Sequence, residues 1–484
     1  MIGIKSIMRS LAVNKIAGCL TGEKEDLRKL AELGKVAEIQ DPAVEEFLDN
    51  LRASIEDNAG FARLFLRIGK NLNPSYRKKI VSNLIFNQFI DGKRKRKSLI
   101  TEDQWVPCLL VISPTMRCNL HCTGCYAGLY GKNEELSENE LFRILREARS
   151  LGIYFIVISG GEPFTMSDVL LHVFKKFKDM FFLVYTNGTL ISESITQKLA
   201  KCGNAALAIS VEGYEEDTDS RRGQGIFQRV LKTMERLNKK KVLFGISVTQ
   251  TRNNIETVTA DDFVEYFMEK GAMFGWYFMF MPVGKDPILD LVPTPEQRVY
   301  SCRRVTDLRD KYPLFLADFW NDGPAAGGCL AGGRQYVHIL NTGNVEPCVF
   351  AHFSSDNIKN KSLLEVTNSP FFRAIRREFP YNENGNLKRP CMIIDNPEVL
   401  RKLVDKYVIP SGHTNSDAVI HDPEVVRWID DYAAQYRALV DEEWESLIND
   451  SNNRWYKEGC DYKKLFMHKQ DKPDRSIVEK EPVH

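Results

Sequence analysis

The chain has 484 residues, of which 43% are hydrophobic and 27% are charged, and its formal net charge is +1. This balance argues against a dedicated nucleic-acid binder, which would carry a clear excess of Lys and Arg. The sequence contains no uninterrupted apolar run of about 18 residues, so a membrane-spanning helix is not expected. A secretory signal is not expected either, because Lys5, Arg9 and Lys15 interrupt the apolar residues of the start.

The 11 cysteines form an odd number in a sequence with no evident export signal. This pattern fits metal ligation or catalysis in a reducing cytoplasm better than a disulfide framework. We therefore expect a cytoplasmic protein. Cys19, Cys108 and Cys202 have apolar neighbours and no clustered partner, so we interpret each of them as structural.

Residues 1–104 show mostly helical patterns. At the start, one helix face collects four apolar side chains at helical spacing, namely Ile4, Ile7, Met8 and Leu11. This face either packs on the rest of the protein, which we favour, or lies as a basic amphipathic helix on a membrane surface. The basic run 93–97 could bind anionic lipid or phosphate, but we favour a solvated linker.

Between residues 105 and 300, short β-rich runs alternate with helical patterns. Ser137 and Glu140 form a capping-box pair that predicts the start of the first helix. Six strand–helix repeats without hairpin turns predict an α/β fold with parallel strands, arranged as an open, partial (βα)6 barrel. The expected strands are Leu109–Ser113, Tyr154–Ser159, Phe182–Thr186, Ala206–Val211, Leu243–Thr249 and Trp276–Met281.

Residues 301–410 are less regular and predict a small α+β domain. A hairpin is expected over Tyr336–Leu340, with a turn at 341–343 and a return through Val345. The last region, 411–484, contains a long helical pattern that opens at Pro423, whose aromatic residues are expected to pack against the core. Beyond about residue 465 the composition predicts a disordered tail.

The most informative motif follows the first expected strand. Cys118, Cys122 and Cys125 have the spacing Cys-x3-Cys-x2-Cys. Three thiolates can hold three corners of an iron–sulfur cubane and leave one iron open to a substrate. A structural zinc would need a fourth ligand, and His121 is poorly suited because it adjoins Cys122. A purely electron-carrying cluster would also need a fourth cysteine.

This cysteine motif resembles the signature of the radical S-adenosylmethionine (SAM) superfamily. The resemblance implies a 4Fe-4S cluster that binds SAM and cleaves it reductively to a 5′-deoxyadenosyl radical. It also implies an electron donor such as flavodoxin or ferredoxin. One position departs from the family pattern, because the residue before the last cysteine is often aromatic and here is Gly124. Tyr126 is expected to cover the cosubstrate instead.

Three further motifs follow the next three strands, where parallel strands present their carboxyl ends together. Gly160-Gly161-Glu162-Pro163 resembles the family motif that contacts the methionine amine of SAM, although a GGEP sequence alone could be a turn. Arg222 could pair with the SAM carboxylate or simply be solvated. The residues expected to bind the cosubstrate are Tyr126, Gly160, Gly161, Glu162, Pro163, Thr186, Asn187, Ser210, Glu212, Arg222 and Ser247.

A second cysteine set lies in the region 301–410. Cys329, the Gly-x4-Cys pair Gly343 and Cys348, and the distant Cys391 resemble the SPASM or shorter twitch extension of the superfamily. The resemblance implies one auxiliary 4Fe-4S cluster on these three cysteines. Its fourth ligand could be Cys302, Cys460, a non-cysteine group or the substrate. The alternative is that the three cysteines are structural.

The resemblance therefore implies a radical SAM enzyme that abstracts hydrogen from a peptide, lipid or small metabolite. The auxiliary cluster would transfer an electron or anchor the substrate. The reaction is either an oxidation or a radical bond formation, and no catalytic side chain is identified. The alternative is a non-enzymatic iron–sulfur or zinc scaffold. No nucleic-acid partner is expected, and the N-terminal helix could make a peripheral membrane contact.

Overall fold

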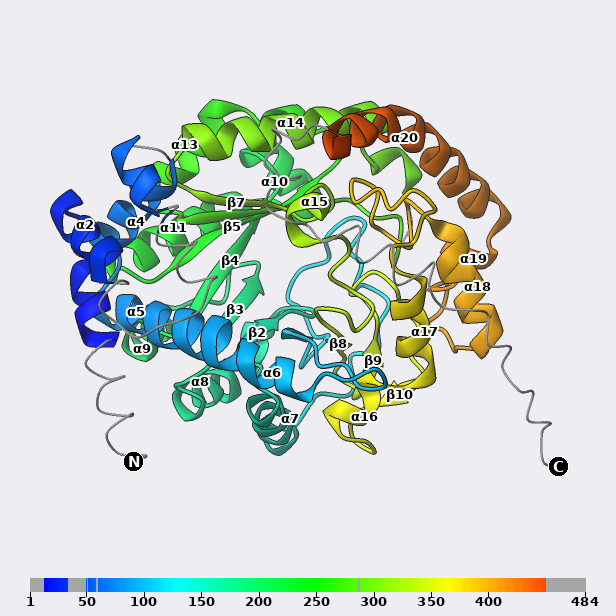
Figure 1. Cartoon of the computed structure of the whole chain (residues 1–484), viewed down its shortest axis with the longest axis horizontal. Helices are drawn as coiled ribbons and strands as arrows, with labels where there is room; N and C mark the ends of the chain where they lie inside the picture. The colour runs from blue at the N-terminus through cyan, green and yellow to red at the C-terminus, as the bar shows by residue number, and fades with distance from the viewer. Residues whose placement is uncertain (1–12, 34–48, 50, 58–59, 285–287, 450–484) are drawn as a thin grey trace.

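A computed structural model describes residues 13–33, 49, 51–57, 60–284 and 288–449 of the chain (Figure 1). The expected amphipathic helix of the first residues and the expected disordered tail lie outside these ranges, so both stay predictions. Within the described ranges, no helix combines the length and the apolar character that crossing a membrane requires.

The centre of the molecule is one sheet whose strands follow the order β10-β9-β8-β1-β2-β3-β4-β5-β6-β7. Neighbouring strands from β1 to β7 are parallel, which confirms the partial barrel and adds β7 to the six expected strands. The strands are β1 (Leu109–Ile112), β2 (Phe155–Ile158), β3 (Phe181–Thr186), β4 (Ala205–Val211), β5 (Phe244–Gln250), β6 (Phe274–Met279) and β7 (Phe315–Asp318).

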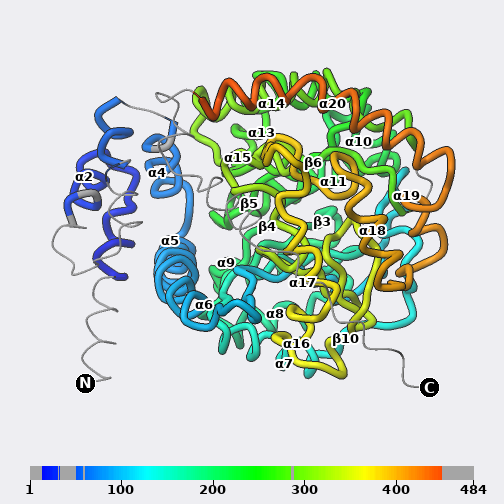
Figure 2. The backbone as a smooth tube through the Cα atoms, turned by 45° about the vertical axis from the view of Figure 1, so that its right-hand side comes forward, coloured from blue at the N-terminus to red at the C-terminus, as the bar shows by residue number. Residues whose placement is uncertain are grey.

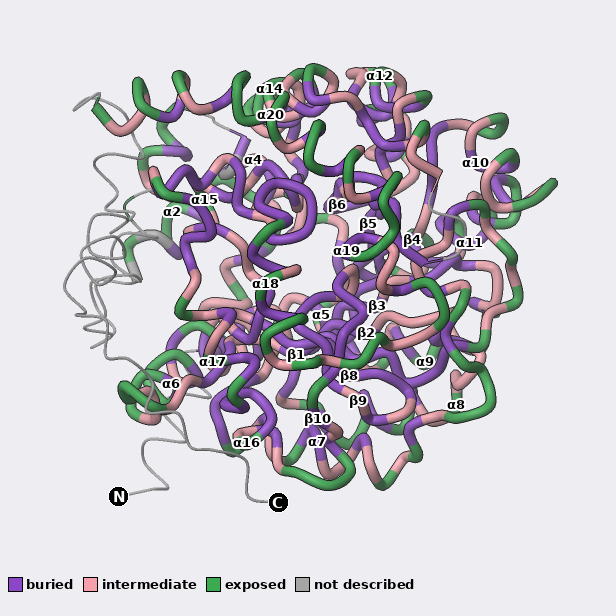
Figure 3. The backbone as a smooth tube through the Cα atoms, turned by 90° about the vertical axis from the view of Figure 1, so that its right-hand side faces the viewer, coloured by how far each residue is buried: buried purple, intermediate pink, exposed green. Residues whose placement is uncertain are grey.

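Helices follow the strands and pack on the outside of the sheet (Figure 1). The first of them, α7, begins with the expected capping box of Ser137 and Glu140. The helices of this layer are α7 (Glu138–Ser150), α8 (Ser167–Lys176), α9 (Glu193–Cys202), α10 (Glu215–Arg222), α11 (Ile226–Lys239), α12 (Ile255–Val258), α13 (Asp261–Glu269) and α14 (Pro295–Lys311). Figure 3 shows the strands as mostly buried backbone between these helices.

The expected hairpin of the third region is present and extends the same sheet. Strands β8 (His338–Ile339) and β9 (Asn344–Glu346) are antiparallel, and β10 (Asp356–Asn357) follows at the edge. Strand β8 pairs in parallel with β1, a contact that the sequence analysis did not predict. The third region is therefore joined to the barrel by backbone hydrogen bonds.

The described parts of the N-terminal region are helical, as expected, and pack against β2, β3 and α9. It comprises α2 (Lys24–Leu33), α4 (Gly60–Asn71), α5 (Pro74–Lys79), a segment of wider helical turns, η1 (Ile80–Gly92), and α6 (Lys93–Leu99). The fully buried Tyr76 of α5 donates a hydrogen bond to the carbonyl of Ala205 at 2.7 Å, which attaches this region to β4.

The basic run 93–97 is helical, so the interpretation as a solvated linker is wrong. Arg96 is buried and donates hydrogen bonds to the carbonyl oxygens of Gly152 and Gln88. The helix can approach the barrel closely because Gly92 faces Gly152 without side chains between them. The other four residues of the run are exposed to solvent, as the charge pattern predicts.

The described parts of the third region and of the C-terminal region contain six further helices. They are α15 (Gly323–Ala326), α16 (Leu363–Thr367), α17 (Pro370–Glu378), α18 (Pro397–Tyr407), α19 (Ala418–His421) and α20 (Pro423–Asn449). Helix α20 packs against α14 and runs beside it along the upper edge of the molecule (Figure 2). Its residues Tyr432, Tyr436 and Trp444 are buried, which confirms that these aromatic side chains serve packing.

A buried carboxyl lies at the end of β7. Asp318 accepts a hydrogen bond from Asn321 at 2.8 Å, while its second carboxylate oxygen has no partner among the described residues. Burial and the neighbouring Asp322 raise the pKa of Asp318 to about 6. Ionised Asp318 therefore destabilises the folded chain near neutral pH.

We expect Asp318→Asn to stabilise the protein at pH 8 and to have little effect at pH 4. The folded carboxyl has a pKa of about 6 and the unfolded one about 3.8, so the folded state loses relative stability as the pH rises through this window. At pH values above this window, the free energy of unfolding is lower by at most about 3 kcal/mol. Denaturant unfolding at both pH values measures it.

The matched control is Asp290→Asn, because the side chain of Asp290 is 95% exposed. That variant should behave like the wild type at both pH values. An equal effect of Asp318→Asn at pH 4 and pH 8 would show that the buried charge is not the cause.

Candidate cluster and cosubstrate site

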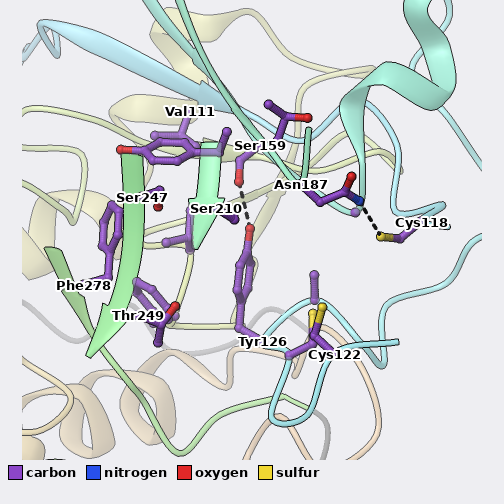
Figure 4. A pocket seen from close by; sticks show the side chains of 18 of the residues that line it. Val111, Cys118, Cys122, Tyr126, Ser159, Asn187, Ser210, Ser247, Thr249 and Phe278 are labelled. Atoms are coloured by element: carbon purple, nitrogen blue, oxygen red, sulfur yellow. Dashed lines mark hydrogen bonds between the residues drawn. The ribbon is translucent and has the colours of Figure 1, made fainter. Parts of the chain in front are cut away.

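A cavity of about 410 Å³ opens at the carboxyl ends of the barrel strands. Its lining includes all three cysteines of the first motif, and Figure 4 shows their loop facing the ends of the strands. Eight of the eleven expected cosubstrate residues line it, namely Tyr126, Gly160, Gly161, Thr186, Asn187, Ser210, Arg222 and Ser247. Glu162, Pro163 and Glu212 do not.

The three cysteines are half-buried neighbours in the loop after β1. Burial raises the pKa of the Cys118 and Cys125 thiols, and the nearby Cys122 raises both further. Such thiols lose their protons readily only when a metal binds them. The donor set therefore fits a metal centre that faces the cavity.

Three thiols in one cavity match the number of protein ligands of a cubane with one open iron. Within the described residues, no three Cys, His, Asp or Glu side chains are gathered as ligands of one metal ion. Zinc ligands stand about 4 Å apart, because each zinc–sulfur bond is about 2.3 Å long. Thiolates of a cubane instead bind different irons, so they can share one cavity while standing farther apart.

The loop after β2 lies directly on the cysteine loop. Gly161 N donates to the carbonyl of Thr115 at 3.0 Å, and Glu162 N donates to the carbonyl of Arg117 at 2.8 Å. A Cβ atom at Gly160 or Gly161 would lie 2.3 Å from a carbonyl oxygen of the cysteine loop. Glycine is therefore required at both positions, since any side chain would push the two loops apart.

Glu162 has a different position from the one expected for a cosubstrate contact. Its side chain is fully buried, and its carboxylate accepts hydrogen bonds from Phe164 N, Thr186 Oγ1 and Asn187 N at 3.0, 2.8 and 2.7 Å. Burial raises the pKa of this carboxyl, and the three donors oppose that rise. Glu162 thus connects the end of β3 to the loop after β2.

Asn187 in turn reaches the cysteine loop. Its amide nitrogen lies 3.0 Å from Asn119 Oδ1 and 3.9 Å from Cys118 Sγ (Figure 4). Ser210 and Ser247 occupy equivalent positions on β4 and β5 and face the cavity (Figure 4). The ends of the second to fifth strands therefore place short polar groups around one space, as the sequence pattern predicted.

Arg222 was expected to pair with a bound carboxylate, but in the structure it already pairs with Glu212. Glu212 is buried and accepts hydrogen bonds from Arg221 Nη1 at 2.6 Å and from Arg222 Nε at 2.8 Å. Arg222 still lines the cavity, but its guanidinium is already neutralised by Glu212. Arg221 was not expected as part of this group.

The departure at Gly124 has a structural explanation. The backbone has φ +62° here, and a Cβ atom would lie 2.5 Å from the ring of Phe280. Phe280 follows β6 and lines the cavity, so it fills the space that a side chain at position 124 would occupy. No spacing pattern pointed to Phe280, because it is distant from Gly124 in the chain.

Tyr126 extends into the cavity, as expected. Its hydroxyl lies 2.8 Å from Ser159 Oγ, and its ring lies 5.5 Å from that of Phe350 (Figure 4). Burial raises the pKa of its phenol to about 12, so it stays neutral. Phe350 follows Cys348 closely, so Tyr126 connects the first cysteine loop with the second cysteine region.

The deeper part of the cavity is apolar. Tyr185, Trp276 and Phe278 lie on inner strands, yet they are half-exposed because they face this space. The Tyr185 and Phe278 rings are 5.5 Å apart and edge to face. None of the described Asp or Glu side chains lines the cavity, and its basic residues are His121, Lys132, Arg221 and Arg222.

The second cysteine set comes together around two tyrosines. Cys348 is buried, and its Sγ lies 3.2 Å from the hydroxyl of Tyr336. Burial and the neighbouring Cys329 raise the pKa of Cys348 to about 12. Burial raises the pKa of Cys391, and Asp395 and Cys329 nearby raise it further. The structure thus gathers the three cysteines that the sequence analysis grouped.

Of the proposed fourth ligands, Cys302 lies elsewhere. It belongs to α14, and its charged neighbours are Asp318, Asp322, Lys388 and Glu443 rather than the three cysteines. Cys460 falls outside the described residues.

A buried ion pair holds Cys391 in place. Asp395 accepts a hydrogen bond from Cys391 N at 3.0 Å and binds the guanidinium of Arg298 through both oxygens. Both charged side chains are at most 1% exposed. Arg298 belongs to α14, so the loop of Cys391 is anchored to the helix layer of the barrel.

Comparisons with known proteins agree with this site. A sequence model described as the radical SAM superfamily matches residues 112–267, and one described as an iron–sulfur cluster-binding domain, SPASM, matches residues 329–392. The chain is 27% identical over 322 residues to an AdoMet-dependent heme synthase of Methanosarcina barkeri, covering 60% of this chain and 90% of that protein.

Two further matches extend the comparison. The chain is 30% identical over 295 residues to the mycofactocin maturase MftC of Mycolicibacterium smegmatis, covering 56% of this chain and 72% of that protein. The crystal structure of Streptococcus suis SuiB bound to precursor peptide SuiA has a TM-score of 0.51 and 19% identity, covering 78% of this chain and 89% of that one. The latter likeness concerns the fold.

We expect Glu162→Gln to lower both thermal stability and SAM affinity. The amide would turn a nitrogen donor toward groups that already donate, so at least one buried hydrogen bond is lost. A loss of about 1.5 kcal/mol would weaken binding roughly tenfold. Anaerobic calorimetric titration with SAM measures this effect. Glu193→Gln, at a half-exposed position of α9, is the control, and equal affinities of both variants would contradict the assigned role.

Proposed function

The chain belongs to the radical SAM superfamily, and from this we propose that it cleaves SAM reductively and abstracts hydrogen from a substrate in the barrel cavity. The observation that carries the proposal is the shared cavity of Cys118, Cys122 and Cys125, with polar strand ends on one side and apolar strands beneath. The SPASM match supports an auxiliary 4Fe-4S cluster in the same protein.

In this proposal the three cysteines of the first motif hold the SAM-binding cluster. When bound, the cluster and SAM together supply a 5′-deoxyadenosyl radical that removes a hydrogen atom from the substrate. The cavity shields that chemistry from water, because its walls beyond the cysteines are apolar. Asn187 orients Cys118 through its amide group.

The polar strand ends hold the methionine and ribose parts of SAM. Gly160 and Gly161 bring backbone groups to the cavity, while Thr186, Asn187, Ser210 and Ser247 offer side-chain hydrogen bonds. Glu162, Pro163 and Glu212 act as positioning residues behind this surface, because they do not line the cavity. Arg222 presents a neutralised guanidinium, which suits hydrogen bonding better than charge pairing.

We assign the aromatic contact with the adenine to Phe280. The family pattern places an aromatic residue at position 124, and in this chain the ring of Phe280 occupies that space. Tyr126 contacts Ser159 and Phe350 instead, toward the substrate side. This assignment transfers the contact from the cysteine loop to the end of β6.

The substrate places an apolar group in the deeper part of the cavity. Tyr185, Trp276 and Phe278 form the chamber below the polar strand ends, and an ionised group would lose its hydration there without an opposite charge. The names of the relatives include a heme synthase and a maturase, so they do not narrow the substrate to one class. The chamber favours a peptide, lipid or metabolite whose reacting carbon is part of an aromatic or aliphatic group.

The auxiliary cluster of Cys329, Cys348 and Cys391 lies next to the same cavity. Leu330, Val349 and Phe350, which are adjacent to or near these cysteines, line it. This supports an electron exchange with the substrate or a role in anchoring it. The proposal also requires a one-electron donor such as flavodoxin or ferredoxin, and it leaves the membrane contact of residues 1–12 as a prediction.

We expect the anaerobically reconstituted protein to form 5′-deoxyadenosine from SAM and dithionite, and Cys122→Ala to abolish this. The variant removes one of the three thiolates that leave one iron open. Chromatography of the quenched reaction measures the product. Cys202→Ala, in the outer helix α9, is the control and should retain activity. Tightly bound zinc without iron would instead support the scaffold alternative.

Phe280→Leu should weaken SAM binding roughly tenfold without changing the iron content. The variant keeps an apolar side chain but removes the ring, and stacking on a base is worth about 1–3 kcal/mol. Anaerobic titration with SAM, alongside iron analysis, measures both quantities. Phe315→Leu, at a position that is 53% exposed, is the matched control. Unchanged affinity in Phe280→Leu would refute the adenine assignment.

A further inference from the structure

Two buried tyrosines face the cysteines of the auxiliary site. Tyr336 is 3% exposed and Tyr381 is 5% exposed, and both belong to the region between Cys329 and Cys391. Tyr336 contacts Cys348, and Tyr381 lies beside Gly332, three residues after Cys329. No sequence motif pointed to either residue.

The hydroxyl of Tyr336 already contacts a cluster ligand. It lies 3.2 Å from Cys348 Sγ, within hydrogen-bond range for sulfur. Once Cys348 is a metal-bound thiolate it has no proton to donate, so the phenol must be the donor. Tyr336 would then donate a hydrogen bond to a sulfur ligand of the cluster.

Tyr381 is buried in the second cysteine region. It lies beside Gly332, where an added Cβ would be 3.3 Å from the phenol oxygen. Gly332 N in turn donates to the carbonyl of Pro347, next to Cys348. The Tyr381 hydroxyl therefore lies near the backbone that precedes Cys348. Buried phenols almost always find a partner.

The charged neighbours of the site are already engaged. Arg334 donates to the carbonyl oxygens of Cys329 and Gly327 at 2.7 Å each. Asp395 is bound by Arg298 and by the backbone of Cys391. The two phenols are therefore neutral side-chain donors near the cysteines, in addition to Ile393 N, which donates to Cys391 Sγ at 3.4 Å.

We propose that Tyr336 and Tyr381 donate hydrogen bonds to the sulfur atoms of the auxiliary cluster and thereby raise its reduction potential. A donor dipole stabilises the additional negative charge of the reduced cluster, and hydrogen bonds to sulfur are a principal control of iron–sulfur potentials. A higher potential makes the cluster a better electron acceptor. The inference rests on the auxiliary cluster of the proposed function but not on radical formation.

The test uses the full-length chain with Cys118, Cys122 and Cys125 all changed to Ala, so that only the auxiliary cluster is reconstituted. Tyr336→Phe, Tyr381→Phe and the double variant are prepared in this background. Potentiometric titration followed by electron paramagnetic resonance gives the midpoint potential, and iron and sulfide analysis gives the occupancy. Tyr277→Phe is the control, because its buried hydroxyl donates to the carbonyl of Val258 on the other side of the barrel.

We expect each single variant to retain the cluster and to show a more negative midpoint potential, with a larger shift in the double variant. The control should match the parent chain. Unchanged potentials in both single variants would overturn the proposal. Loss of iron in Tyr381→Phe, with unchanged thermal unfolding of the metal-free chain, would also overturn it, because Tyr381 would then be a ligand rather than a donor.

Discussion

The close contact between the loops after β1 and β2 is the constraint on which the site depends. The cysteine loop can face the cavity only because Gly160 and Gly161 have no side chains. Two backbone hydrogen bonds then fix the distance between the loops. Through Glu162 the same contact continues to the end of β3, where Asn187 reaches Cys118. One tight backbone approach thus aligns three successive strand ends.

The apolar chamber depends on a second arrangement, the distribution of large side chains among the strands. In a closed barrel such inner residues fill the interior in layers. Here the polar ends of β4 and β5 and the aromatic residues of β6 leave a space between them. The resulting cavity combines a polar upper part with an apolar lower part. That combination suits a polar cosubstrate above a substrate group that reacts through a carbon–hydrogen bond.

Local sequence patterns predicted much of the secondary structure and the first cysteine site. The capping box at Ser137, the cysteine spacing and the strand-end motifs all follow from short-range rules, and the structure confirms the strands and helices that they predicted. Contacts between distant segments were not readable. Phe280 beside Gly124, Arg298 with Asp395, and Tyr381 among the cysteines depend on tertiary packing that no local spacing encodes. The basic run 93–97 was misread because the burial of Arg96 depends on Gly152, far along the chain.

The parallel pairing of β8 with β1 has a consequence for how the two halves of the protein work together. Because the second cysteine region continues the central sheet, it cannot swing away on a hinge as a tethered module would. The distance between the two cysteine sites is therefore fixed when the chain folds. Electron tunnelling across it would proceed at a rate fixed by architecture rather than by the frequency of domain encounters.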